Sequence, residues 1–426
     1  MSATHRAAVS RALFIGTVWP EPESSAAGIR TLGLIKALLQ EGWEIHFLSP
    51  AVEKEFTVAL RELGVQTRSQ QANEPGFDRF VEELSPDVAI YDRFIMEEQF
   101  GWRVRENSPA TLNVLDTIDL HFLRRGRHEA LQAGQPLEAV FNAAWDFSDP
   151  AAPGHEDALR EVGSIFRCDL TLMISDFELE LLADRLSVPR ELLLHLPFFL
   201  APAERTLAPA FEQRAHFVSI GNFRHLPNAD GVRWLKERIW PAIRKELPEV
   251  EAHVYGAYPS REMMDLTNAR QGFHVHGPAP HAVETLRRYR VNLAPLRFGA
   301  GIKGKVADGW CAGAPTVTTP IGAEGMCVPG AEFAGAVERS EEAFARACVL
   351  LYRDAQAWSV AQASGFEAFD GLFAETRNAR RFLDAISALR AKLPQHRSRN
   401  FMGSMLKHHF HQSTKYFSRW IEAKNR

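Results

Sequence analysis

The sequence has few of the residues that mark disulfide-linked or metal-bound proteins. Its 426 residues include only four cysteines, Cys168, Cys311, Cys327 and Cys348, and no two of them form a CxxC pair. This scatter excludes a cysteine-rich zinc pattern and a disulfide framework, and it is typical of reduced thiols in a cytosol. We therefore expect no disulfide and no bound metal.

Long apolar runs and a strong net charge are also missing. The apolar run from Ala12 to Val18 has the length of a buried strand, is too short to cross a membrane, and is not followed by a small-residue cleavage site. We therefore expect a cytoplasmic protein. The formal net charge of −4 argues against nucleic acid as a partner and favours a small molecule.

The length and the hydrophobic pattern predict two α/β domains. A chain of 426 residues exceeds what one hydrophobic core usually supports, which suggests two domains of roughly 200 residues. Short apolar runs alternate with helical patterns in both halves, which predicts βαβ units and doubly wound parallel sheets. Three prolines, Pro197, Pro202 and Pro209, interrupt the pattern. We expect a first Rossmann-like domain over residues 1–200, a linker over 201–213, a second Rossmann-like domain over 214–375, and C-terminal helices with a basic tail over 376–426.

Individual elements follow from the same pattern. In the first half, helix is expected over 28–40 and strands over 12–16, 44–48, 87–91, 111–115 and 169–174. In the second half, Asn228 is expected to cap a helix that runs to Leu247. Strands are expected there over 216–220, 251–255, 291–296 and 315–319, with helices over 282–288 and 306–311.

A glycine-rich segment between two of these strands carries the clearest functional signal. Residues 297–305 read RFGAGIKGK and connect a buried strand to a helix. Glycines allow close approach of the backbone to an anion, and the free N–H groups of a helix start attract negative charge. Lys303 and Lys305 add two positive charges. The segment therefore predicts phosphate binding, against the alternative of a plain glycine turn with two solvated lysines.

Two familiar phosphate-binding patterns match this segment only in part. Gly299, Gly301 and Gly304 satisfy GxGxxG, with Glu324 about twenty residues on, but a dinucleotide fingerprint normally opens the first βαβ unit of its domain. The segment also satisfies GxxxxGK, but Val306 stands where a P-loop needs Ser or Thr for Mg²⁺. A glycine-rich phosphate loop, a dinucleotide fingerprint and a P-loop all bind phosphate, so phosphate binding does not depend on which pattern applies.

Three segments resemble a known family. FVSIGNFRHLPN (217–228), LAPLRFGAGIKGKVADGWCAG (293–313) and PTVTTPIGAEG (315–325) are similar to the nucleotide-sugar domain of family 4 glycosyltransferases, within the glycosyl transferases group 1 of the GT-B superfamily. A weaker similarity extends to residues 14–30, 114–124 (VLDTIDLHFLR) and 169–178 (DLTLMISDFE). The resemblance implies two Rossmann-like domains that face each other across a cleft, with C-terminal helices that cross back to the first domain.

The resemblance also implies an activity. Similar proteins are retaining transferases that move a hexosyl or similar group from a nucleoside-diphosphate sugar, without a bound metal or other cofactor. The acceptor is a glycan, a lipid-linked molecule or another acceptor, as in glycan biosynthesis. Two alternatives stay open: another sugar-nucleotide enzyme of this superfamily, such as an inverting transferase or an epimerase, and a non-catalytic protein that binds nucleotide or glycan.

The donor site is expected around the glycine-rich segment. Many family members carry two glutamates seven residues apart, and these positions fall on Ala300 and Asp308. Asp308 can still accept hydrogen bonds from ribose hydroxyls, whereas Ala300 can contribute only through its backbone. The residues implied in donor binding are Gly299, Ala300, Gly301, Ile302, Lys303, Gly304, Lys305, Asp308, Arg224, Glu324 and Gly28.

Some of these positions also fit other roles. Arg224 could be a simple surface residue, and Glu324 could cap the turn after it. Gly28 begins a helix after a loop expected to face the cleft, where it would contact the donor phosphate or the acceptor, but the loop could equally be merely exposed.

The resemblance places a catalytic histidine in the first domain. His121 matches the position at which family members often contact the transferred sugar, and Asp119 could orient its ring. Lys303 would stabilise charge on the leaving pyrophosphate. A lone histidine is more often a packed or surface residue, which is the alternative here. Asp116 and Arg124 are further candidates.

The C-terminal tail is basic and aromatic. Lysine and arginine occur at 392, 397, 399, 407, 415, 419, 424 and 426 against a single acid, Glu422, and Phe401, Met405, Phe410, Tyr416, Phe417 and Trp420 lie between them. This composition predicts either an interfacial helix on the inner face of an anionic membrane or a helix that packs on the first domain.

Overall fold

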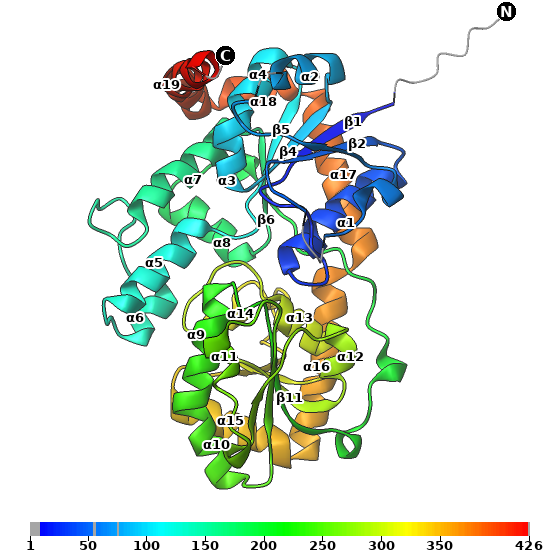
Figure 1. Cartoon of the computed structure of the whole chain (residues 1–426), viewed down its shortest axis with the longest axis vertical. Helices are drawn as coiled ribbons and strands as arrows, with labels where there is room; N and C mark the ends of the chain where they lie inside the picture. Colours follow the sequence, from blue (N-terminus) through cyan, green and yellow to red (C-terminus); the bar gives the residue numbers. More distant parts are fainter. Residues whose placement is uncertain (1–8, 54–56, 75, 425–426) are drawn as a thin grey trace, which may run out of the picture.

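The chain folds around two parallel β-sheets, one in each half of the sequence. The computed structural model describes residues 9–53, 57–74 and 76–424, apart from the side chains of residues 410–412. A seven-stranded sheet has the order β3-β2-β1-β4-β5-β6-β7, and a six-stranded sheet has the order β10-β9-β8-β11-β12-β13. Figure 1 shows the two sheets stacked along the long axis of the molecule, each flanked by helices. The predicted pair of Rossmann-like domains is confirmed.

The first sheet has buried central strands and is covered by helices on both faces (Figure 1). Its strands are β1 (Arg11–Ile15), β2 (Glu44–Ser49), β3 (Gln66–Ser69), β4 (Val88–Asp92), β5 (Leu112–Asp116), β6 (Leu170–Met173) and β7 (Leu193–His195). The helices that connect them are α1 (Ala26–Gln40), α2 (Phe77–Leu84), α3 (Arg93–Met96), α4 (Trp102–Asn107), α5 (His121–Gln132), α6 (Leu137–Asn142), α7 (His155–Arg167) and α8 (Asp176–Glu180).

The second sheet has the same parallel winding. Its strands are β8 (Ala215–Ile220), β9 (Ala252–Tyr255), β10 (Phe273–Val275), β11 (Tyr289–Ala294), β12 (Thr316–Thr318) and β13 (Gly335–Val337). The helices around it are α9 (Leu226–Trp234), α10 (Trp240–Glu246), α11 (Arg261–Met264), α12 (Ala282–Leu286), α13 (Gly304–Cys311), α14 (Pro320–Ala323), α15 (Glu341–Arg353) and α16 (Ala355–Phe373).

One predicted helix cap is wrong. The helix after β8 begins at Leu226, and its N-cap is His225 rather than Asn228. The side-chain amide of Asn228 instead donates to the carbonyl of Asn222 at 2.9 Å. Pro227 explains the earlier start, because proline is favoured in the first turn of a helix, where its missing N–H has no partner to lose.

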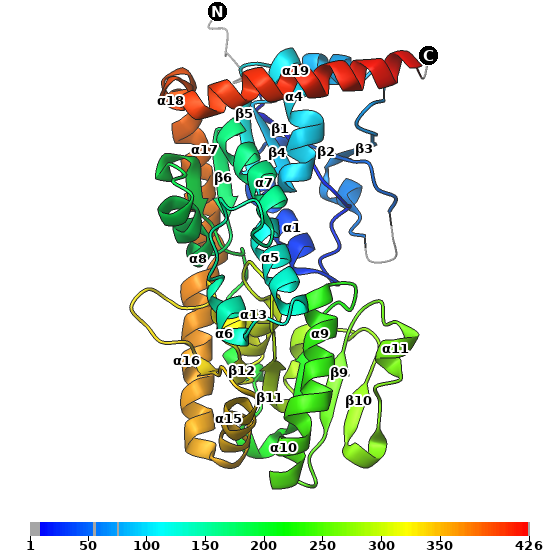
Figure 2. The ribbon, with the colours of Figure 1, turned by 90° about the vertical axis from the view of Figure 1, so that its left-hand side faces the viewer.

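The last helices cross back to the first domain, as the resemblance implied. The chain passes the domain junction beside Leu200, whose N–H donates to the carbonyl of Phe373 at 2.8 Å. From there α17 (Glu375–Ala391) packs on α1 and β5, and after α18 (Leu393–Arg399) helix α19 (Phe401–Lys424) packs on α7 and α4 (Figure 2). Among the described residues, none of the helices combines the length and the apolar character needed to cross a membrane.

Candidate active site

The glycine-rich segment forms a loop at the junction of the two domains. It follows β11, Lys303 is the N-cap of α13, and its last two residues, Gly304 and Lys305, are the first two of that helix. Gly301 has a positive φ of 66°, and a Cβ atom placed there would lie 2.9 Å from the Cβ of Asp119 in the first domain. A Cβ atom on Gly304 would lie 3.1 Å from that of Ala26 at the start of α1. Glycine is therefore needed at position 301 both for the backbone and for the approach of the domains.

Three non-glycine residues with a positive φ lie at the same edge of the two sheets. Arg93 after β4, Ile118 after β5 and Tyr258 after β9 have positive φ values of 68°, 64° and 56°. Such conformations cost about 1–3 kcal/mol each in a non-glycine residue and concentrate at functional sites. All three residues follow the carboxyl end of a strand, which is where open parallel sheets bind ligands.

Lys303 is buried and turns back on its own loop. Only 8% of the residue is exposed, and its Nζ atom donates to the carbonyl of Ala300 at 3.2 Å and to that of Gly301. Burial lowers the pKa of Lys303, although the carboxylates of Glu324 and Glu178 oppose that shift. In this arrangement Lys303 stabilises the turn from inside.

Lys305 and Asp308 lie one helical turn apart on α13, and both are half-buried. Burial lowers the pKa of Lys305 to about 8 and raises that of Asp308 to about 7. No ion pair involving either side chain is recorded among the described residues. Two desolvated charges without a protein partner are typical of a ligand site.

Glu178 binds the loop from the first domain. Its Oε1 atom accepts the N–H of Gly301 at 2.7 Å and the N–H of Leu120 at 3.0 Å. The loop N–H at Gly301, which sequence analysis assigned to a phosphate, is therefore engaged by a carboxylate of helix α8. Glu178 ends the segment 169–178 that resembles the family, but no local pattern predicts this contact with the loop.

Glu324 pairs across the domain junction with Arg127 of α5. Two hydrogen bonds of 2.8 and 2.5 Å join the guanidinium to the carboxylate, and Arg127 also donates to the carbonyl of Gly299 at 2.9 Å. The ring of His128 stacks on Phe298 of the loop with 4.5 Å between ring centroids. Arg127 is fully buried, and sequence analysis missed it because nothing local distinguishes it from the exposed Arg125 of the same helix.

His121 and Asp119 lie together in the first domain, facing the loop. The distance from His121 Nε2 to Asp119 Oδ1 is 3.3 Å, and Arg124 forms an ion pair with the other oxygen of Asp119. Burial would raise the pKa of Asp119, but Arg124 and His121 hold it below its usual range. Burial lowers the pKa of His121 to about 4, so its ring is neutral at physiological pH.

Asp116 has a structural role in the first domain. It forms a buried ion pair with Arg30 of α1 at 2.7 Å, and Arg30 also donates to the carbonyl of Leu196. This network fixes α1 to the end of β5. Gly28 lies on the same helix, where a Cβ atom would stand 2.4 Å from the backbone of Glu21, and its N–H donates to the Ser25 hydroxyl at 3.1 Å.

Arg224 and His225 follow β8 on the second-domain side. Arg224 is exposed, and its guanidinium lies 3.6 Å above the ring of Tyr258. His225 is open to solvent, yet the surrounding walls desolvate its ring and, together with Arg124, lower its pKa to about 4. The charges of Asp119 and Lys305 also act on His225, which places it between the two domains. Sequence analysis did not single out His225, although it adjoins Arg224.

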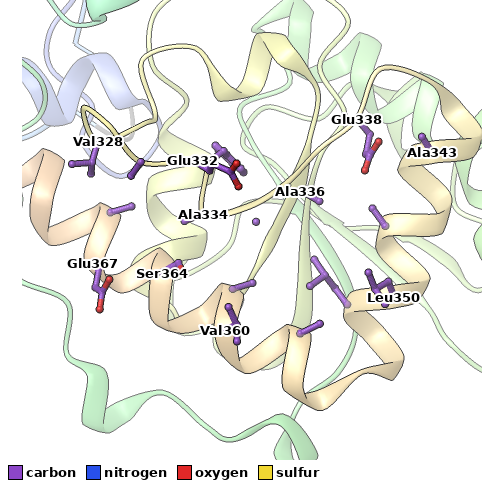
Figure 3. A pocket seen from close by; sticks show the side chains of 18 of the residues that line it. Val328, Glu332, Ala334, Ala336, Glu338, Ala343, Leu350, Val360, Ser364 and Glu367 are labelled. Atoms are coloured by element: carbon purple, nitrogen blue, oxygen red, sulfur yellow. The ribbon is translucent and has the colours of Figure 1, made fainter.

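A large pocket lies elsewhere on the second domain. It has a volume of about 970 Å³ and is bounded by α15, α16 and the segment around β13, with mostly small apolar residues and a few carboxylates at its rim (Figure 3). Val328, Ala334, Leu350 and Val360 are among the side chains that line it. None of the predicted site residues lines this pocket, so it is separate from the loop.

Solved structures with the same two-domain architecture define the fold class. A glycosyltransferase from Rickettsia africae ESF-5 is similar over 90% of this chain and 99% of its own, with a TM-score of 0.61 and 10% identity. Sucrose-phosphate synthase from Thermosynechococcus elongatus covers 89% of this chain, with 99% of its own chain, a TM-score of 0.62 and 14% identity. HepE of Anabaena in complex with UDP-glucose is similar over 89% of this chain and 100% of its own, with a TM-score of 0.61 and 11% identity. The fold is GT-B.

The sequence of the second domain is also similar to a known family. Residues 214–354, which include the glycine-rich loop, match the family model described as glycosyl transferases group 1. No curated protein matches the sequence significantly. The match and the fold together identify the chain as a glycosyltransferase of the GT-B type, an enzyme class that uses nucleotide sugars.

Proposed function

We propose that the protein is a retaining, metal-independent transferase, similar to family 4, that moves a hexosyl group from a nucleoside-diphosphate sugar to a glycan or lipid-linked acceptor. The observation that carries the proposal is the pair of desolvated charges, Lys305 and Asp308, beside the glycine-rich loop. The complex of HepE with UDP-glucose, a protein of the same fold, supports a donor of this kind.

The donor would bind with its pyrophosphate at the loop and the start of α13. Lys305 supplies a positive charge, the helix N-terminus supplies N–H groups, and Asp308 accepts hydrogen bonds from the ribose. Lys303 donates hydrogen bonds to the loop carbonyls and adds its positive charge from the buried side of the loop. Positive groups placed where the leaving pyrophosphate gains charge stabilise the transition state without a metal ion.

The reaction would proceed on one face of the donor sugar. The bond from the anomeric carbon to the β-phosphate oxygen breaks, the acceptor oxygen bonds to the same face, and the leaving phosphate takes the acceptor proton. This scheme needs no separate protein base. Neutral His121, oriented by Asp119, would hydrogen-bond a hydroxyl of the sugar, and Arg224 and Glu324 would border the donor.

Calorimetric titration tests the donor assignment. We would titrate the purified protein with UDP, GDP, dTDP and ADP, with and without Mg²⁺, and repeat the measurement with Lys305→Ala and Lys303→Ala. Binding of one nucleotide that does not depend on metal and is weakened in the variants supports the proposal. Lys36→Ala, an exposed lysine on α1, is the matched control. Absence of binding to all four nucleotides would contradict the assignment.

Product analysis separates the catalytic alternatives. Retention at the anomeric carbon, followed by NMR during turnover, is the expected outcome. Inversion would indicate an inverting transferase, and a change within the sugar would indicate an epimerase. Ala300, where relatives carry a glutamate, makes a non-catalytic binding protein the remaining alternative, and nucleotide binding without any turnover would support it.

We propose further that α19 rests on the inner face of the membrane. One side of this helix packs on the first domain through Gly403 and Ser418. The other side is exposed and carries aromatic side chains, with 77% of Phe401, 65% of Tyr416 and 58% of Trp420 accessible. Such a face beside basic residues is typical of an interfacial helix on anionic lipid. Two of the basic and aromatic tail residues, Arg426 and the side chain of Phe410, lie outside the described part of the chain.

Self-association through α19 is the competing arrangement, and charge argues against it. Arg419 and Lys424 border the aromatic face, and in a dimer they would lie close to the positive side chains of the second copy and repel them. Flotation with vesicles decides the matter. Binding to vesicles that contain phosphatidylglycerol, weak binding to phosphatidylcholine alone, and loss of binding in Tyr416→Ser/Trp420→Ser support membrane contact. A dimer that the same variant dissociates would contradict it.

A further inference from the structure

Glu178 stands out among the buried ionisable groups near the loop. It lies on α8 with none of its surface exposed, and one of its carboxylate oxygens accepts two backbone N–H groups. The other oxygen, Oε2, is buried and has no hydrogen-bond partner. An unsatisfied buried carboxylate oxygen is costly, so its retention calls for a reason.

The two N–H groups belong to different domains. Gly301 lies in the glycine-rich loop of the second domain, and Leu120 is the residue that precedes His121 at the start of α5. One oxygen atom thus fixes the distance between the loop that holds Lys303 and the segment that holds His121. Arg127 also bridges the domains, but it holds the loop through the carbonyl of Gly299 and starts from the middle of α5.

The charges around Glu178 are those of the site itself. Burial raises the pKa of Glu178, and the nearby Asp119 raises it further, while the two N–H groups and Lys303 act in the opposite direction. The hydrogen bonds depend on an acceptor oxygen, which an amide side chain also offers. Exchange of the carboxylate for an amide therefore separates the role of the oxygen from that of the charge.

We infer that Glu178 is a positioning residue for sugar transfer, which holds the glycine-rich loop and the His121 segment in register through the N–H groups of Gly301 and Leu120. The inference rests on the proposed function. Removal of this link leaves the groups that bind nucleotide in place but lets the two domains misalign, and a misplacement of about 1 Å can slow a reaction about 100-fold.

Hydrogen exchange tests the link independently of activity. In Glu178→Ala, we expect faster amide exchange in peptides that cover 299–305 and 117–122 together, whereas Glu178→Gln, which keeps an acceptor oxygen, retains the slow exchange of the wild type. Unchanged exchange in Glu178→Ala would overturn the inference. This readout remains valid even if the wild type binds no nucleotide, an outcome that would contradict only the proposed function.

Steady-state kinetics test the catalytic consequence. Glu178→Ala should lower kcat by about 100-fold and leave the dissociation constant of the nucleotide little changed, and Glu178→Gln should recover most of the loss. A parallel loss of kcat and nucleotide affinity would point to general damage of the fold and would overturn the inference. So would wild-type kcat in Glu178→Ala.

Glu161 provides the matched control. This glutamate of α7 is also fully buried and accepts the N–H of Phe122, at the start of α5, at 3.1 Å, but its recorded hydrogen bonds stay within the first domain. Glu161→Ala should lower Tm about as much as Glu178→Ala and affect kcat less. An equal loss of kcat in the two variants would show that the contact with the second domain is not what matters.

Discussion

The charged side chains on the two sides of the domain junction differ in whether they have ion-pair partners. On the first-domain side, the charged groups near the site are tied to partners: Arg30 to Asp116, Arg124 to Asp119, and Arg127 to Glu324 of the opposite domain. On the second-domain side, Lys305 and Asp308 on α13 have no ion pair recorded among the described residues. Both sides are desolvated, so the difference is one of partners rather than of burial.

This contrast separates architecture from ligand binding. A buried pair such as Arg127–Glu324 fixes geometry, because loss of either member leaves an uncompensated charge. A desolvated charge without a partner lowers the stability of the folded protein. A bound ligand of opposite charge offsets that cost. Substitutions on the two sides of the junction test this division.

Removal of Arg127 should have the largest effect on stability. Arg127→Ala leaves Glu324 unpaired at the domain junction, and we expect the free energy of unfolding to fall by about 3–5 kcal/mol. Denaturant titration measures this loss. Arg125→Ala, at a neighbouring residue whose side chain is 63% exposed, should change stability by less than about 1 kcal/mol. Equal losses of unfolding free energy in the two variants would show that the buried pair contributes no more to stability than the exposed arginine.

Nucleotide binding should depend on pH in a bell-shaped way. Lys305, with a pKa of about 8, is charged below that value and loses its charge as pH rises, while Asp308, with a pKa of about 7, gains its charge above pH 7. Affinity should therefore be highest between pH 7 and 8. Lys305→Ala should reduce affinity about 10- to 100-fold, the value of a charge-assisted hydrogen bond, and flatten the alkaline side. An unchanged profile would contradict the role of Lys305.

Asp308→Asn should raise stability while it weakens binding. The folded pKa of Asp308 lies above its unfolded value of 3.8, so the wild type loses stability as pH rises towards 7 and keeps that penalty at higher pH. Asparagine avoids the penalty, and the variant should exceed the wild type in Tm at pH 8 but match it near pH 4. A lower Tm at pH 8 would show that Asp308 has a stabilising partner.

Arg224→Ala should have the smallest effect. The side chain is exposed and stacks on Tyr258, and such contacts contribute about 0.5–1 kcal/mol. We expect nucleotide affinity to fall about two- to fivefold, well below the effect of Lys305→Ala. Arg233→Ala, which removes another exposed arginine of the same domain, is the control. A loss as large as that of Lys305→Ala would make Arg224 a principal phosphate ligand.

Much of the fold could be predicted from the sequence. Apolar runs located the central strands to within one or two residues, because strands buried on both faces of a parallel sheet read as continuous hydrophobic segments. The edge strands β3, β7, β10 and β13 were not among the predicted strands. Strand β3 reads QTRS and is mostly exposed, so its hydrogen bonding to β2 rather than its composition makes it a strand.

The glycine-rich loop and its lysines were also visible in the sequence, since glycine, charge and their place after a strand are local properties. The tertiary structure alone decided which charges have partners. Glu324 meets Arg127 from 197 residues away, and Glu178 meets Gly301 from 123 residues away. Pairs of this kind arise only when two separately wound sheets are brought together, and no local pattern of residues encodes their geometry.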